Sequence, residues 1–161
     1  MGEFELIRRH FVRPAPAASA VALGVGDDCA LLRPSPGHEL AVSTDMLVEG
    51  RHFFADVDPA ALGHKALAVN LSDLAAMGAR PLGFTLALSL PRADDAWLSA
   101  FAGGLFALAD AHACPLVGGD TTRGVGRSRR ARASAFTGGG AQGSWRNCAS
   151  ARRASPVRPL R

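Results

Sequence analysis

Short apolar runs in the first half of the chain predict β-strands. Runs of strand length occupy 20–25, 29–32 and 40–42, and a turn rich in proline and glycine over 34–37 precedes the last of them. From 84 to 90, large apolar residues alternate with smaller or polar ones, a pattern typical of a half-buried strand. These segments predict the strands of one core.

Longer segments have the spacing of helices. Residues 3–11 predict a short helix, and the pair Asp58-Pro59 is a start signal for a second one that ends near Gly78. Residues 94–111 predict an amphipathic third helix, which is followed by a short strand at 115–117. The order of strands, helix, strand, helix and strand predicts an α/β or α+β fold with one core.

Charge divides the chain into two parts. Residues 1–124 hold nine basic and 14 acidic residues, a net charge of −5, whereas residues 125–161 hold nine arginines and no acid, a net charge of +9. The overall charge of +4 therefore comes from the carboxy-terminal part. The whole chain is therefore not expected to be a basic nucleic-acid binder, because its positive charge describes the carboxy-terminal part and not the body.

Cysteine spacing and the lengths of the apolar segments bear on location. Cys29, Cys114 and Cys148 have no CxxC spacing, so free thiols in a reducing compartment are expected. No apolar signal-peptide core begins the chain, and the longest uncharged apolar run, 96–109, is too short to span a bilayer. The sequence predicts a soluble, cytoplasmic protein without membrane contact.

Four clusters of acidic and hydroxyl side chains lie beside or within the predicted elements. A single cluster of this kind is most often a solvated turn. Several carboxylates at one end of a sheet would repel one another unless a cation lay among them, and hard oxygen ligands suit Mg²⁺, which often bridges to substrate phosphates. Taken together, the clusters predict a Mg²⁺ site. They are Gly26-Asp27-Asp28, Ser43-Thr44-Asp45, Asn70-Leu71-Ser72-Asp73 and Gly118-Gly119-Asp120-Thr121-Thr122.

Two common phosphate-binding motifs do not account for these clusters. The sequence contains no GxxxxGK[ST] motif, and its only lysine, Lys65, lies in a predicted helix. Residues 24–29 imitate the first part of GxGxxG, but no helix begins there and two carboxylates would face the pyrophosphate. Neither a P-loop nor a dinucleotide fold is expected.

Four segments resemble the thiamine-monophosphate kinase family, in that family's order and spacing, and the resemblance covers residues 2–124. Gly-Asp-Asp alone would indicate only the wider superfamily, which includes aminoimidazole ribonucleotide synthetase, selenide water dikinase and a hydrogenase-maturation protein. The segments over 43–53 and 65–79 are more specific, because they match the thiamine-monophosphate kinases and not only the superfamily. The resemblance implies an aminoimidazole ribonucleotide synthetase-like amino-terminal domain, a mixed sheet with helices on one face. The segments are LGVGDDCALL (23–32), STDMLVEG (43–50) followed by His52-Phe53, KALAVNLSDLAAMGA (65–79) and GGDTTRG (118–124).

The resemblance also implies an activity and a role for each matching position. Family members use ATP and several Mg²⁺ ions to convert thiamine monophosphate into thiamine diphosphate, with no side chain needed as a general base, and they form homodimers through this domain. Gly119 and Asp120 match an ATP-contacting pair, and His52 matches a substrate-contacting histidine. The positions that match Mg²⁺ ligands are Asp28, Ser43, Thr44, Asp45, Asp73 and Asp120.

The resemblance stops at Gly124, inside a motif, where the family continues with another strand and then a second α/β domain. Residues 125–161 hold only five large apolar residues among 37, and they predict a disordered, arginine-rich tail. A shifted reading frame is the favoured explanation, and a genuine basic extension that binds anions is the alternative. The predicted organisation is therefore a Mg²⁺- and ATP-binding domain over 1–124 and a tail over 125–161.

Several functions remain open from the sequence. The leading hypothesis is a thiamine-monophosphate phosphotransferase, truncated in this chain. The alternatives are another ATP-using member of the same superfamily, an inactive fragment that binds magnesium and nucleotide, and an arginine-rich nucleic-acid binder.

Overall fold

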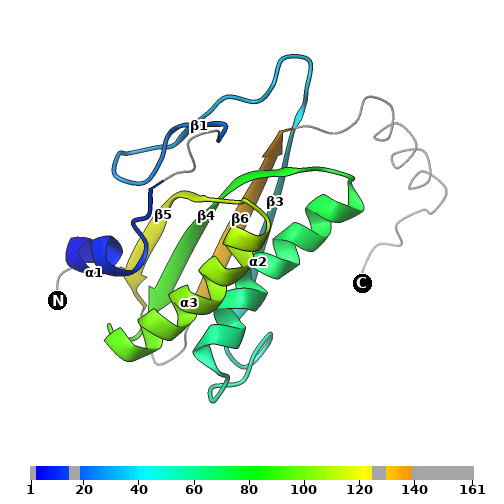
Figure 1. The fold of residues 1–161 in the computed structure, drawn as a ribbon. Coiled ribbons are helices and arrows are strands. Elements are labelled where there is room, and N and C mark those ends of the chain that lie inside the picture. Colours follow the sequence, from blue (N-terminus) through cyan, green and yellow to red (C-terminus); the bar gives the residue numbers. More distant parts are fainter. Residues whose placement is uncertain (1–2, 15–18, 125–129, 139–161) are drawn as a thin grey trace, which may run out of the picture.

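The computed structural model describes residues 3–14, 19–124 and 130–138, with side chains for 5–14 and 19–124. Figure 1 shows the elements along the chain. In order they are α1 (Glu3–His10), β1 (Val21–Leu23), β2 (Leu31–Leu32), β3 (Leu40–Val48), α2 (Pro59–Ala76), β4 (Pro81–Leu90), α3 (Asp95–Ala111), β5 (Leu116–Arg123) and β6 (Arg130–Gly138).

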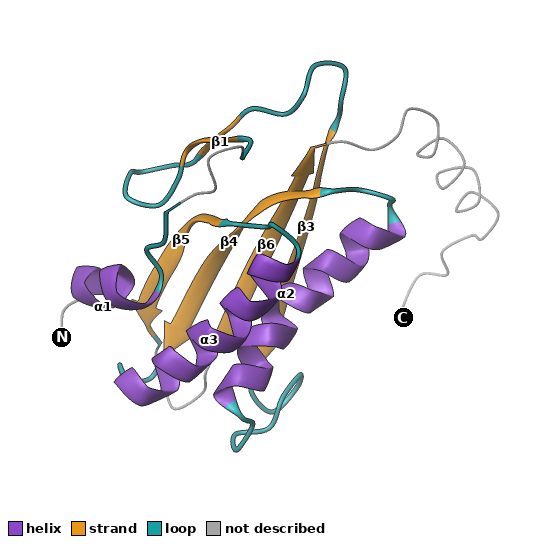
Figure 2. Ribbon diagram, in the orientation of Figure 1, coloured by secondary structure: helices purple, strands orange, loops and turns teal. Residues whose placement is uncertain are grey.

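Four of the strands form a mixed sheet in the order β3-β6-β4-β5. Strands β4 and β5 are parallel and are joined through α3, whereas β6 is antiparallel to both of its neighbours. Helices α2 and α3 cover one face of this sheet, and β1 and β2 form a separate two-stranded hairpin (Figure 2). The predicted fold class, a mixed sheet with helices on one face, is confirmed.

The core lies between this sheet face and the two helices. Every second residue of β4 from Phe84 to Leu90 is buried, as the alternating pattern predicts. The helices contribute buried side chains such as Leu67 of α2 and Leu105 of α3. Asp58 caps α2 by accepting hydrogen bonds from the N–H groups of the second and third helical residues. No helix within the described ranges is long and apolar enough to cross a membrane.

Strands β3 and β5 are longer than predicted, and β6 was not predicted as a strand. Strand β5 covers Leu116–Arg123, beyond the predicted 115–117. Strand β3 continues through the polar residues 43–45, beyond the apolar run at 40–42. Strand β6 lies within the predicted tail, between β3 and β4, and it pairs with both by backbone hydrogen bonds. Residues 130–138 are therefore part of the sheet, which corrects the expectation for that segment. Residues 125–129 and 139–161, and with them Cys148, lie outside the described residues.

Helix α1 is attached to α3 by ion pairs. Arg9 and His10 both contact the Asp95 carboxylate, at 3.2 and 2.9 Å. Just beyond the helix, the Arg13 guanidinium donates two hydrogen bonds to Asp110, at 3.0 and 3.2 Å. These contacts hold α1 beside β5, at the edge of the sheet (Figure 1).

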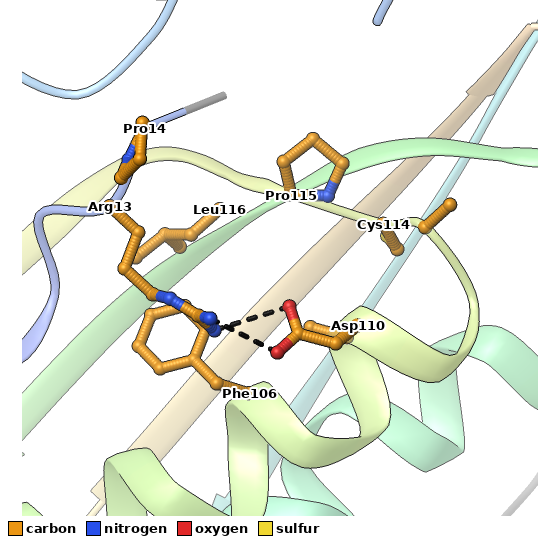
Figure 3. A pocket seen from close by; sticks show the side chains of 9 residues that line it. Arg13, Pro14, Phe106, Asp110, Cys114, Pro115 and Leu116 are labelled. Carbon is orange, nitrogen blue, oxygen red and sulfur yellow. Dashed lines mark hydrogen bonds and ion pairs between the residues drawn. The ribbon is translucent and has the colours of Figure 1, made fainter. Parts of the chain in front are cut away.

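A hollow of about 250 Å³ lies beside the Arg13–Asp110 pair (Figure 3). The Arg13 guanidinium lies over the Phe106 ring, 4.6 Å from its centroid. Cys114 also lines the hollow, and its burial raises the pKa of the thiol to about 12, so the thiol stays protonated at neutral pH. None of the sequence-predicted site residues is among the residues described along this hollow, so it is separate from the candidate site.

Candidate functional site

Strand β3 and helix α2 bring Ser43 and Asp73 into contact, and β3 places Asp45 on the same face as Ser43. The Ser43 hydroxyl donates a hydrogen bond to Oδ2 of Asp73 at 2.6 Å, across 30 residues of chain. Because side chains alternate along a strand, Asp45 lies on the same face of β3 as Ser43 and the buried Leu47. Two carboxylates and a hydroxyl therefore share the helix-covered side of β3. We call Ser43, Asp45 and Asp73 the oxygen cluster.

Thr44 does not share that side. It lies between Ser43 and Asp45 on β3, so its side chain points to the other face of the sheet, where it is exposed. The Thr44 hydroxyl is therefore not part of the oxygen cluster.

Gly119 and Asp120 lie on β5, at the opposite edge of the sheet from β3. Both are exposed, and they line a small hollow with Ile7 of α1 and Phe11, the residue that follows this helix. Ile7 and Phe11 are four residues apart, a helical spacing that places them on one side, and that signal in the sequence could have identified this side of the hollow. The β5 end of the predicted site therefore combines a glycine-rich strand with an apolar surface.

One row of the sheet connects the two regions. Asp45 pairs in register with Ala133 of β6, Ala133 with Leu86 of β4, and Leu86 with Gly119 of β5. Neighbouring strands lie about 4.8 Å apart, so three steps separate the backbones of Asp45 and Gly119 by roughly 14 Å. Asp120 follows Gly119 directly, so it lies at nearly the same height on the sheet as Asp45 but across its width.

Asp28 lies in an exposed turn between β1 and β2. Its backbone N–H donates to Oδ1 of Asp27 at 2.8 Å, so the Asp27 carboxylate orients this turn. Val25, in the same turn region, lines the hollow that contains Asp120. Across the described ranges, no three side chains of His, Cys, Asp or Glu lie close enough together to hold a metal ion by themselves.

The donor atoms of the oxygen cluster nevertheless fit Mg²⁺. This ion prefers oxygen ligands and is usually held by one or two carboxylates together with waters and substrate phosphates, not by a complete cage of side chains. Asp45 and Asp73 supply two carboxylates. The Ser43 hydroxyl donates its hydrogen bond to Asp73, which leaves the lone pairs of the Ser43 oxygen available to a cation.

His52 lies in the loop after β3, with its ring held by the backbone. The amide N–H of Val48 donates to the imidazole Nδ1 at 3.0 Å, and Nζ of Lys65 donates to the backbone carbonyl of His52 at 2.6 Å. The contact with Lys65 joins this loop to α2. Sequence reasoning did not assign a role to Lys65, because a lysine in an exposed helix gives no local signal of its partner.

Comparisons with known proteins agree with the sequence resemblance. The family described as AIR synthase related protein, N-terminal domain, matches residues 26–141. Thiamine-monophosphate kinase of Salmonella typhimurium is 58% identical over 123 residues, which are 76% of this chain and 38% of the relative. The crystal structure of thiamine-monophosphate kinase from Stenotrophomonas maltophilia K279a is 49% identical with a TM-score of 0.70, over 77% of this chain and 38% of that one.

A further solved structure is described as AaThiL complexed with AMPPCP and TMP. It is 29% identical to this chain with a TM-score of 0.61, and the match covers 71% of this chain and 36% of that one. The match thus spans only about 38% of the length of the curated relative named above.

Proposed function

Because this chain belongs to the family of AIR synthase related proteins, through their N-terminal domain, we propose that it is the Mg²⁺- and ATP-binding part of a thiamine-monophosphate kinase. The reaction proposed is transfer of the γ-phosphoryl group of ATP to thiamine monophosphate, which gives thiamine diphosphate. The observation that carries the proposal is 58% identity to such a kinase over 123 residues. The oxygen cluster supports it, since its donor atoms suit the cation that phosphoryl transfer uses.

We assign the metal role first to the oxygen cluster. Ser43, Asp45 and Asp73 would hold Mg²⁺, which when bound neutralises phosphate charge and aligns the reacting groups. Asp28, Asp120 and the backbone of Thr44 are proposed as ligands of further Mg²⁺ ions. Those ions need phosphate oxygens and waters to complete their coordination, because the protein groups lie apart in the described residues.

The glycine strand and the His52 loop are assigned to the two substrates. Gly119 and Asp120 are proposed to contact ATP, and His52 is proposed to contact thiamine monophosphate. The acceptor oxygen belongs to a phosphate whose second pKa is about 6, so it is largely ionised at neutral pH. No side chain has to remove a proton from it, and the task of the site is to hold two anionic substrates in line.

We also propose that two copies of the chain pair through the open face of the sheet. The face of β3 opposite the helices carries Leu40, Val42 and Met46, which are 46, 57 and 45% exposed. Large apolar side chains about half exposed on one face of a strand, here with Thr44 between Val42 and Met46, favour burial against a partner. A homodimer in the cytoplasm is therefore the proposed state, and neither a membrane nor nucleic acid is a proposed partner.

Formation of thiamine diphosphate tests this proposal. A chain in which residues 1–124 continue in frame into the remaining length of a thiamine-monophosphate kinase should form thiamine diphosphate from thiamine monophosphate, ATP and Mg²⁺. The 161-residue chain should show little or no turnover, because phosphoryl transfer depends on positioning by the whole site. Product is measured at saturating ATP by chromatography.

The competing outcomes separate the alternatives. An inactive continued chain that still binds magnesium and nucleotide would favour the inactive-fragment hypothesis. Equal turnover by both chains would show that residues 125–161 do not limit activity. The proposal that turnover needs the remaining length of the kinase would then be wrong.

A further inference from the structure

The loop that carries His52 is a tight turn held at several points. Gly50 adopts a φ of 79°, a left-handed conformation that glycine accepts without strain, and its N–H donates to the carbonyl of Phe53 at 2.8 Å. The backbone N–H of His52 donates to the carbonyl of Val48 at 2.9 Å. Phe53 is buried in the core, so one end of the turn is fixed by packing.

The hydrogen bond to the ring determines which nitrogen of His52 carries a proton. A backbone amide can only donate, so Nδ1, which accepts from Val48 at 3.0 Å, must have its lone pair available. The neutral ring then carries its hydrogen on Nε2. Because His52 is exposed, this N–H is presented to solvent and to any ligand over the loop.

Lys65 attaches this turn to helix α2. Its ammonium group donates to the His52 carbonyl at 2.6 Å, a charge-assisted hydrogen bond. Eight residues further along α2, Asp73 accepts from Ser43 of β3. At 1.5 Å per residue the two attachment points lie about 12 Å apart along the helix. One rigid helix therefore fixes both the His52 loop and the oxygen cluster relative to β3.

We propose that Lys65 is a positioning residue for substrate binding, which holds the His52 ring so that its Nε2–H donates to the phosphate monoester of the substrate. The inference rests on the proposed function for the identity of that phosphate. Lys65 acts through the His52 carbonyl. Its loss removes the hydrogen bond between α2 and the carbonyl of His52 itself, the residue whose ring must be held. The backbone bonds and Phe53 keep the turn in place, but the His52 residue is released, so the Val48–Nδ1 bond opens and the ring rotates away from the ligand.

Two readouts on the 161-residue protein test this role. The first is the scalar coupling across the hydrogen bond between the Val48 amide nitrogen and Nδ1 of His52, measured by NMR without ligand. The second is the Kd for thiamine monophosphate, measured by titration of the same spectra with Mg²⁺ present. Lys65→Met should abolish the coupling and raise the Kd by about tenfold, and Lys65→Arg should restore much of both.

Arg51→Met is the matched control, since it removes one positive charge close to His52, as Lys65→Met does, but from the loop and not from α2. It should keep the coupling and the wild-type Kd, and core amide signals should show that every variant is folded. Coupling that persists in Lys65→Met, or an equal loss in Arg51→Met, would overturn the positioning role. If wild type does not bind thiamine monophosphate although Lys65→Met loses the coupling, the assignment of His52 to the substrate phosphate fails and the positioning of the ring stands. The proposed function itself is tested separately, by product formation in the chain that continues in frame.

Discussion

Replacing Gly104 with alanine should unfold the domain or destabilise it by more than about 3 kcal/mol. Gly104 of α3 crosses α2 so closely that an added Cβ would lie 1.9 Å from the carbonyl oxygen of Ala60. Gly63 makes the reciprocal approach from α2, where a Cβ would lie 2.0 Å from the carbonyl oxygen of Phe101. In both cases the obstacle is backbone, which cannot rotate aside, so the two helices would have to separate.

Gly103 provides a matched control in the adjacent position. A Cβ there meets nothing within 4 Å, and the residue is exposed. Alanine at 103 should therefore be neutral or should stabilise the helix by up to about 1 kcal/mol. Urea unfolding of the two variants gives the comparison. Similar unfolding free energies for Gly103→Ala and Gly104→Ala would show that the helix crossing is not as close as described.

Gly119→Ala should remove nucleotide binding and destabilise the sheet by more than about 3 kcal/mol. Gly119 has a φ of 150°, and a Cβ would lie 1.9 Å from the carbonyl oxygen of Leu86 on the neighbouring strand. Alanine would push β5 away from β4. Asp120 would then move with β5, and the part of β5 that is proposed to contact ATP would be displaced.

Gly118→Ala separates this effect from a general intolerance of β5 to side chains. A Cβ at 118 would have its nearest contact at 3.9 Å, with the side chain of Thr85, which is an ordinary distance. This variant should keep a free energy of unfolding close to that of the wild type. Calorimetric titration with Mg-ATP and urea unfolding would test the pair, and wild-type affinity in Gly119→Ala would contradict the assignment of β5 to the nucleotide.

Local signals in the sequence predicted the parts of the fold that local physics determines. Asp58 followed by Pro59 marked the start of α2, and the alternation from 84 to 90 marked β4, because a cap and a strand face depend on neighbouring residues. Strand β6 gave no such signal. Its alternate positions 131, 133 and 135 are alanines, too small to produce a hydrophobic alternation, and its pairing is with strands far away in the chain.

In the candidate site too, residue types could be predicted from the sequence, whereas the contacts between distant residues could not. The clusters around Ser43, Asp73 and Asp120 could be named from residue type and resemblance. The sequence could not show that Ser43 bonds Asp73 while Asp120 lies three strands away, since both depend on strand order. The contact between Lys65 and the His52 carbonyl could not be predicted either. A hydrogen bond from a helix side chain to a loop carbonyl produces no periodic pattern in the sequence.

Thermal stability in Mg²⁺ tests most directly the central claim that the oxygen cluster holds the cation. Binding to the folded state alone adds about 2.7 kcal/mol at a Mg²⁺ concentration of 100 times Kd, or roughly 5–10 °C for a protein of this size. Asp45→Asn should lose most of this gain. Asp110→Asn, which breaks only the exposed ion pair with Arg13, should keep it. Equal gains in the two variants, or no gain in the wild type, would contradict the claim.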